Sequence, residues 1–275
     1  MFRVSERNPR TFWAATDGTG TYYVGQLVAY SAATQAATPG TVVPLAVPSG
    51  LGDQTNCQII AGVVVGINNR TPTSNSTGEY GTAVVSSANQ KARDWIGAEG
   101  MYIKGDPQLL VQVAEITPST VVEGDLRAGA VGTSVTINTV SASTDADGMI
   151  STNVTVNTIA HTPVASKGTI YCRTGANAGI YRVNTNTSTT VPQVTTGFPY
   201  NVAAGDTFAI VGFKQGFSEI YIGGPGLYID NTVSISSNTT FQVIIYKLDL
   251  RTAGKETAQF RFTAPHFDFN RSVLD

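Results

Sequence analysis

Short runs that alternate between apolar β-branched and polar residues constrain this chain more than any other feature. The clearest are 134–140 (SVTINTV) and 152–159 (TNVTVNTI), in which Val or Ile alternates with Thr or Asn. Successive side chains of a strand point to opposite faces, so this period of two indicates strands with one buried and one hydrated face. Similar short runs recur along the chain, each bounded by Gly, Pro, Asn or Ser clusters. The sequence therefore predicts an all-β fold with very little helix.

The strand-like runs fall into two series of similar length, and 275 residues are enough for about two domains. We expect tandem small β-barrel or sandwich domains at 16–118 and 119–220. An extended N-terminal arm is expected at 1–15, and a C-terminal β-segment with an aromatic tail at 221–275. The one candidate for a short helix is 87–96 (SANQKARDWI).

Charged residues make up 13% of the chain, roughly half of the usual ~25%. Thr and Asn in place of Lys and Glu suit a surface that meets other protein, because few long side chains must be immobilised on contact. The net charge is −2 without a polybasic run, which argues against nucleic-acid binding by counterion release. No signal-peptide pattern or membrane-length apolar run occurs, so we expect a soluble protein made in the cytoplasm.

Residues that could run a reaction are scarce. His161 and His266 are the only histidines, and neither has a second metal ligand at a suitable spacing. The 145–148 segment (DADG) begins like a calcium loop but lacks the later ligands and is better interpreted as a turn. Cys57 and Cys172 lie in apolar runs and are expected to be buried thiols. The sequence predicts no catalytic residue, no cofactor and no metal: the protein is expected not to be an enzyme.

Five segments carry a resemblance to a known family. A hairpin at 175–183 (GANAGIYRV) precedes 204–208 (AGDTF), and this pattern resembles a β-module of the capsid decoration, or head cement, proteins of tailed bacteriophages. The segments 24–28 (VGQLV), 60–67 (IAGVVVGI) and 105–113 (GDPQLLVQV) resemble the opening domain of the same proteins.

The resemblance implies β-barrel or β-tulip-like domains, no catalysis, and docking on the outside of an expanded capsid shell. The expected partner is thus the major capsid protein, and the expected location is the virion exterior after assembly in the host cytoplasm. It also implies a homo-oligomer, with a trimer favoured.

Arginine and aromatic residues gather near both ends of the chain, and these residue types dominate the energetics of interfaces. We therefore predict that both termini are contact elements, the alternative being frayed ends without a partner. The predicted contact residues are Arg3, Arg7, Arg10, Phe12, Trp13, Phe260, Phe262, Phe267 and Phe269.

Two other functions fit less well. A glycan-binding or adhesive β-module, including a tail, collar or fibre component, could use Tyr22, Tyr23 or Tyr228 as a platform. A hydrolase would need a pocket that joins His161 to a carboxylate and a serine.

Overall fold

A computed structural model gives the fold of the chain. It describes residues 1–15, 22–30, 41–45, 59–68, 95–96, 102–103, 110–127, 135–144, 150–156, 168–186, 192–194, 198–200, 206–223, 226–230 and 241–267. Strands dominate these residues, and the one helical element among them is the short 3-10 turn Ala264–Phe267. The prediction of an all-β chain is confirmed. The helix predicted at 87–96 is wrong at its end, because Trp95–Ile96 is strand β6, paired with β7 (Tyr102–Ile103); residues 87–94 lie outside the described residues.

The first group of strands is a five-stranded antiparallel sheet, which we name the N-terminal sheet. Its runs are rich in Val and Ile, the β-branched residues that suit a pleated, buried sheet. In spatial order its strands are β2 (Thr11–Ala15), β8 (Leu110–Glu115), β5 (Ile60–Asn68), β3 (Leu27–Tyr30) and β4 (Val42–Pro44).

The second group, the central sheet, assembles five antiparallel strands from distant parts of the chain. A two-stranded ribbon, β17 (Ile222–Gly223) with β18 (Tyr228–Ile229), follows the strand Gly216–Ile220 in the chain. In spatial order the central strands are β1 (Phe2–Val4), β9 (Val122–Asp125), β20 (Thr257–Phe262), β19 (Phe241–Asp249) and β16 (Gly216–Ile220).

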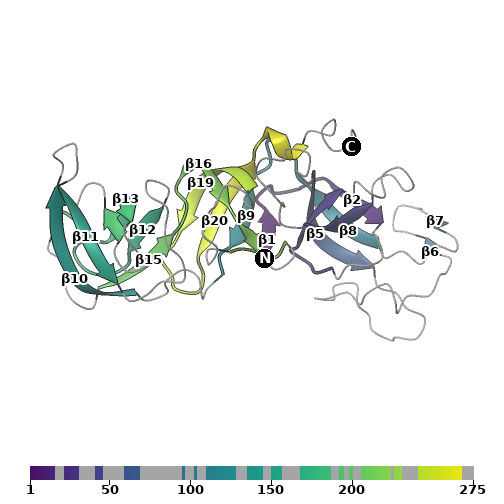
Figure 1. The fold of residues 1–275 in the computed structure, drawn as a ribbon. Helices are drawn as coiled ribbons and strands as arrows, with labels where there is room; N and C mark the ends of the chain where they lie inside the picture. The colour runs from purple at the N-terminus through teal and green to yellow at the C-terminus, as the bar shows by residue number, and fades with distance from the viewer. Residues whose placement is uncertain are drawn as a thin grey trace.

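The third group contains six strands whose antiparallel pairings close into a barrel. It includes both of the clearest predicted strands, as β10 and β11. Figure 1 shows this barrel at one end of the molecule, the central sheet in the middle and the N-terminal sheet towards the other end. The order around the ring is β10 (Val135–Thr144), β11 (Ile150–Val156), β14 (Pro192–Val194), β13 (Gly179–Asn186), β12 (Thr169–Cys172) and β15 (Thr207–Val211).

One strand explains how the barrel joins the rest of the molecule. On β15, Phe208 and Ile210 belong to the barrel core, whereas Ala209 and Val211 belong to the large core cluster of the central sheet. Because neighbouring side chains of a strand point to opposite faces, a strand buried on both faces becomes a continuous apolar run. The same large cluster includes Leu27 of the N-terminal sheet. The central sheet therefore shares one core with the barrel and with the N-terminal sheet.

A buried ion pair spans the joint between barrel and central sheet. Arg173 follows β12 and Glu256 precedes β20, and their side chains are 7% and 0% exposed. The Arg173 guanidinium donates to Glu256 and, through Nε, to the Leu250 carbonyl at 2.9 Å. At the other end of β12, the Thr169 hydroxyl donates to the Phe213 carbonyl at 2.8 Å. These contacts fix the barrel against the central sheet.

The predicted N-terminal arm at 1–15 is wrong. Phe2 is buried, its backbone N–H donates to the Gly25 carbonyl at 2.8 Å, and its ring meets Phe260 edge to face with 6.2 Å between centroids. Gly124 lies opposite Phe2 in β9, where a Cβ would come within 2.4 Å of the Phe2 ring. The arm is instead two strands, because its aromatic and alanine side chains find apolar partners far away in the sequence.

The domain boundaries also differ from those expected. The strands of 221–275 do not form a separate segment, since β19 pairs with β16 and β20 pairs with β9. The expected boundary at 118/119 precedes β9, which joins the central sheet. The barrel begins only with β10. Long-range pairing, which local patterns do not encode, sets this arrangement.

Candidate partner-contact surface

The central sheet has one buried face and one outer face. On β20, Ala258, Phe260 and Phe262 are buried, whereas Gln259 and Arg261 between them are partly exposed. This alternation is the strand period of two with the core on one side. A β-bulge between Ile245 and Lys247 interrupts the pairing of β19 with β20. The residues of the outer face are therefore the ones available to a partner.

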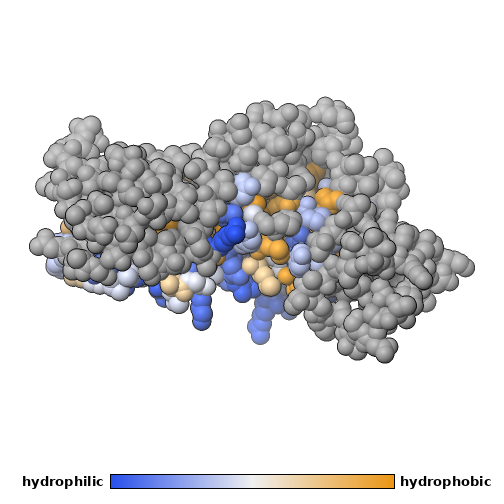
Figure 2. Space-filling model, turned by 60° about the horizontal axis from the view of Figure 1, so that its bottom comes forward, coloured by the Kyte–Doolittle hydropathy of each residue, from blue (hydrophilic) through white to orange (hydrophobic). Residues whose placement is uncertain are grey.

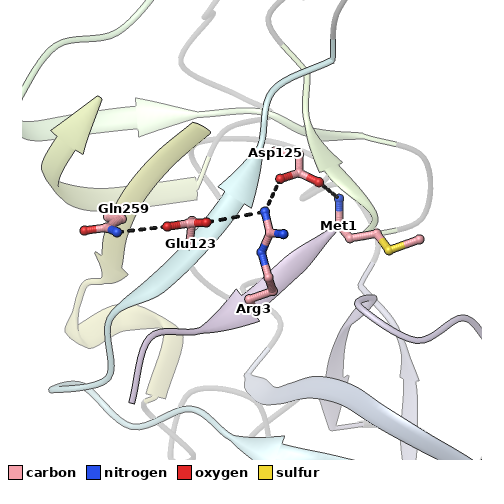
Figure 3. A network of polar contacts seen from close by, with 5 residues as sticks. All are labelled: Met1, Arg3, Glu123, Asp125 and Gln259. Carbon is pink, nitrogen blue, oxygen red and sulfur yellow. Dashed lines mark hydrogen bonds and ion pairs between the residues drawn. The ribbon is translucent and has the colours of Figure 1, made fainter. Parts of the chain in front are cut away.

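A charged network covers the outer face at the β1 and β9 side. The register places Arg3 opposite Glu123, and Glu123 opposite Gln259. The Arg3 guanidinium lies 3.3 Å from a Glu123 oxygen and also bonds Asp125, and the Asp125 carboxylate accepts from the Met1 ammonium at 2.9 Å. The Gln259 amide donates to Glu123 at 2.9 Å. Figure 3 shows Arg3 between the two carboxylates.

This network is balanced in charge and partly exposed, so each of its pairs contributes less than about 1 kcal/mol to stability. Its main effect is to fix the register of β1 on β9. In Figure 2, hydrophilic side chains project from the middle of the molecule, and apolar atoms lie between them.

The β16 side of the outer face differs in character. We name Phe217, Ile244, Tyr246 and Arg261 the outer patch. Phe217 lies opposite Ile244, and Ile244 lies opposite Arg261. The Arg261 guanidinium lies 5.8 Å from the centroid of the Tyr246 ring, within cation–π distance. Phe217 is 61% exposed and Tyr246 is 47% exposed. Two large aromatic side chains thus face solvent, Phe217 from a paired position of β16 and Tyr246 from the bulge in β19.

A third exposed aromatic residue lies on the barrel. Asn177 is buried in the loop between β12 and β13, and its side-chain amide bonds both the N–H and the carbonyl of Tyr200, at 3.0 and 2.9 Å. The Tyr181 hydroxyl donates to the Asn177 carbonyl at 2.9 Å, and the Tyr181 ring meets Phe198 at 4.5 Å between centroids. Tyr200 itself is 63% exposed and Ile180 is 50% exposed. We name the segment 198–200, whose backbone Asn177 holds, the barrel-end loop.

The predicted contact residues at the N-terminus have mixed outcomes. Arg3 and Arg10 are exposed and pair with acidic residues, Arg10 at 3.5 Å from Glu115. Arg7 is exposed. Phe12 and Trp13 are partly buried in β2, where Phe12 packs against the core of the N-terminal sheet. Arg3, Phe12 and Trp13 lie on paired strands, and Arg7 and Arg10 lie in the segment that joins those strands, so these residues do not form a free contact arm.

The predicted contact residues at the C-terminus are mostly core residues. Phe260 and Phe262 are buried, so their assignment to a contact surface is wrong. Both lie on the inner face of β20, where burying their rings removes apolar surface from water and stabilises the fold. Phe267 is partly buried and packs against the same core. Phe269 lies outside the described residues.

His266 is a core residue in the described structure. Its Nε2 accepts from the Gln242 N–H at 3.2 Å, and its ring packs against Phe241 and Phe262. Burial lowers the pKa of His266 to about 4. A neutral, enclosed imidazole of this kind fits packing rather than proton transfer. His161 and the 145–148 segment lie outside the described residues.

Cys172 is a buried thiol, as expected. Its Sγ donates to the Thr174 carbonyl at 2.9 Å, and burial raises its pKa to about 11. Cys57 lies outside the described residues. Within the described part of the chain, no group of three or more His, Cys, Asp or Glu side chains could hold a metal ion.

The tyrosines suggested for a glycan platform are poorly placed. Tyr22 is fully buried, with its hydroxyl donating to the Val42 carbonyl at 3.0 Å, so its assignment is wrong. Tyr23 is partly buried. Tyr228 is partly buried beneath Arg127, whose guanidinium lies 5.3 Å from the ring centroid. The exposed Tyr200 was missed as a platform, although the turn-forming Phe198-Pro199 before it is a signal for a surface loop.

Comparison with protein-family models, curated proteins and solved structures found no match to this chain. In the part of the chain that the structure describes, no helix has the length and apolar character needed to cross a membrane.

Proposed function

We propose that this chain is a virion structural protein that binds the outer surface of an assembled phage capsid and stabilises the shell. The observation that carries the proposal is the outer patch: Phe217 and Tyr246 are exposed beside Arg261 on a hydrogen-bonded sheet. Tyr and Arg are enriched among the residues that dominate interface energetics, and aromatic residues in general are enriched at interfaces. Residues already fixed on paired strands lose little conformational freedom on binding.

The burial and the partners of the ionisable side chains support a role in protein contacts rather than in catalysis. The described histidine is enclosed in the core, the described cysteine is a buried thiol with a raised pKa, and Arg173 and Glu256 pair across a joint between units. Each of these groups has a structural use. The proposal includes a homo-oligomer, with a trimer favoured, and the major capsid protein as partner.

Such a protein stabilises its target by linkage. A ligand that binds the assembled lattice but not the isolated subunits favours the lattice by RT ln(1 + [L]/Kd), which is about 2.7 kcal/mol per site at a hundredfold excess over Kd. Many equivalent sites on one shell multiply this effect. A modest interface on each copy is therefore sufficient.

The proposal is tested by co-sedimentation. The purified chain is mixed with particles assembled from the major capsid protein, and separately with the unassembled capsid subunits. We expect saturable binding to the particles and none to the subunits, because the lattice creates the site. Absence of binding to particles, or equal binding to both forms, would contradict the proposal.

A glycan-binding or adhesive β-module is the second candidate, and the barrel-end loop favours it. Tyr200 is exposed on a backbone held by Asn177, as a stacking platform for a sugar ring requires. Binding to a polysaccharide array that Tyr200→Ala abolishes, without particle binding, would establish this function in place of the first.

A further inference from the structure

The turn Ala264–Phe267, which we name the β20 turn, is bonded to the start of β19 at Gln242. The Gln242 carbonyl accepts from the Thr263 N–H at 3.2 Å and from the Thr263 hydroxyl at 3.1 Å. In a continued antiparallel ladder, the Thr263 carbonyl would accept from the Gln242 N–H in return. That carbonyl instead accepts from the His266 N–H at 3.1 Å, and the Gln242 N–H donates to His266 Nε2 at 3.2 Å. The imidazole therefore takes the place of a backbone carbonyl.

The imidazole is enclosed by apolar side chains. His266 is 3% exposed, and its ring centroid lies 5.3 Å from that of Phe241 and 5.6 Å from that of Phe262. Both phenylalanines belong to the large core cluster on the inner face of the central sheet. Two charged side chains of the neighbouring strand positions point to the outer face instead, because side chains alternate along a strand. They are Glu219, opposite Gln242 on β16, and Arg261, next to Phe262 on β20.

Protonation of the ring is incompatible with this arrangement. A neutral imidazole has one donor nitrogen and one acceptor nitrogen, whereas an imidazolium has two donors and no acceptor. The group that faces Nε2 is the Gln242 N–H, which can only donate. A proton on Nε2 would thus set two donors against each other and place a charge among phenylalanine rings, away from water. Burial accordingly lowers the pKa of His266 to about 4.

We propose that the β20 turn is an acid-sensitive switch, released from β19 by protonation of His266 while the sheets and the barrel stay folded. This inference does not depend on the proposed function. Release is local, because the turn has four residues and lies beyond the pair of Val243 with Phe262. Strand β20 itself stays in place between β19 and β9. Opening uncovers the rings of Phe241 and Phe262, so the protein displays apolar surface in acid that it hides at neutral pH.

The size of the effect follows from linkage between protonation and opening. In the open turn the imidazole meets water and titrates near its ordinary pKa of 6.5, whereas in the closed turn its pKa is about 4. As pH falls, the open form takes up the proton first. The opening equilibrium therefore begins to rise below about pH 6.5 and levels off below about pH 4. Between pH 7 and pH 5 the equilibrium constant for opening should increase by roughly 20-fold.

Hydrogen exchange at the Gln242 amide tests this proposal, because that N–H is the donor to His266. NMR of the full chain follows the amide between pH 7 and pH 5, with rates corrected for the pH dependence of exchange in an unstructured peptide. We expect its protection factor to fall about 20-fold, while amides of β12 in the barrel change by no more than about threefold. A constant protection factor at Gln242, or an equal fall at β12, overturns the inference.

Two variants assign the effect to the imidazole. His266→Gln keeps an acceptor oxygen without a titrating ring, so its Gln242 protection factor should agree within about twofold between pH 7 and pH 5. Asp268→Asn is the matched control, since Asp268 is the next acidic residue in the sequence and lies outside the described residues. It should keep the wild-type pH dependence. The reverse result, with the pH dependence kept in His266→Gln and lost in Asp268→Asn, contradicts the proposal.

A titration of the ring itself needs no change at position 266. His161 is the only other histidine, so His161→Gln identifies the NMR signals of the His266 ring in the otherwise unaltered chain. We expect these signals to titrate well below the ordinary pKa of 6.5, because the closed turn resists the proton. Titration at the ordinary value would show that the ring is open to water at neutral pH, and the inference would be wrong.

Discussion

Removing the Glu256 carboxylate is the most informative perturbation of the fold. The Glu256→Ala change leaves the Arg173 guanidinium, 7% exposed, inside the joint between barrel and central sheet without its acidic partner. One Glu256 oxygen, Oε2, already lacks a hydrogen-bond partner among the described residues. Glu256 therefore bonds Arg173 through its other oxygen, Oε1.

The expected size of the effect follows from burial. Breaking a buried ion pair by removing one partner costs about 3–5 kcal/mol, because a charge remains without compensation. Replacing both partners by apolar residues of similar volume is often neutral or stabilising. We thus expect Glu256→Ala to lose about 3–5 kcal/mol of unfolding free energy, and Arg173→Met with Glu256→Leu to recover most of it.

Scanning calorimetry and urea unfolding measure this loss. For a chain of this size each kcal/mol shifts the melting temperature by about 2–4 °C, so Glu256→Ala should melt about 10 °C lower. The Glu123→Ala variant, whose carboxylate is partly exposed in the outer network, serves as a control and should shift the melting temperature by no more than about 4 °C. A Glu256→Ala melting temperature within about 2 °C of wild type would refute the burial argument.

Three further predictions concern single side chains. The folded-state pKa of His266, about 4, lies below the value of 6.5 for an unperturbed histidine, so the unfolded chain takes up the proton first as pH falls. This contribution is complete above about pH 6.5 and is lost towards pH 4, by up to roughly 3 kcal/mol; urea unfolding of His266→Gln between pH 7 and 4.5 should show a correspondingly shallower decline than wild type. In a Cys57→Ser background, Cys172 should not react with a thiol reagent at pH 8 until the chain unfolds, because burial raises its pKa to about 11; rapid labelling of folded protein would contradict this. Asn177→Ala removes both bonds to the Tyr200 backbone, so we expect about 1–3 kcal/mol of destabilisation and faster hydrogen exchange at the Tyr200 amide, and unchanged exchange would count against the described loop.

The sequence predicted the strands well and their partners poorly. The alternating runs at 134–140 and 152–159 correspond to β10 and β11, because a period of two is a local property. The placement of Phe2–Val4 beside Val122–Asp125 depends on contacts more than a hundred residues apart. No local pattern specifies such a pairing. The N-terminus was predicted as an extended arm, and the C-terminus as a β-segment with an aromatic tail, for this reason.

The contact surface was predicted in the wrong place for the same reason, since local patterns do not specify which strands pair. Phe260 and Phe262 were assigned to a contact surface on residue type, but their spacing of two also fits the buried face of a strand, and the structure places them there. Tyr246 lies on an apolar run, 241–248 (FQVIIYKL), whereas Phe217 stands among polar residues at 214–220 (KQGFSEI). Their exposure follows from the edge position of β16 and from the bulge near Tyr246, features that only the register reveals.

The thermal stability of assembled particles, with and without saturating amounts of this chain, tests the central claim most directly. If the protein stabilises the shell by binding the assembled lattice alone, calorimetry will show particle disruption moving to higher temperature as the chain is added, with saturation at full occupancy. A disruption temperature that stays constant at every concentration of bound chain would contradict the account.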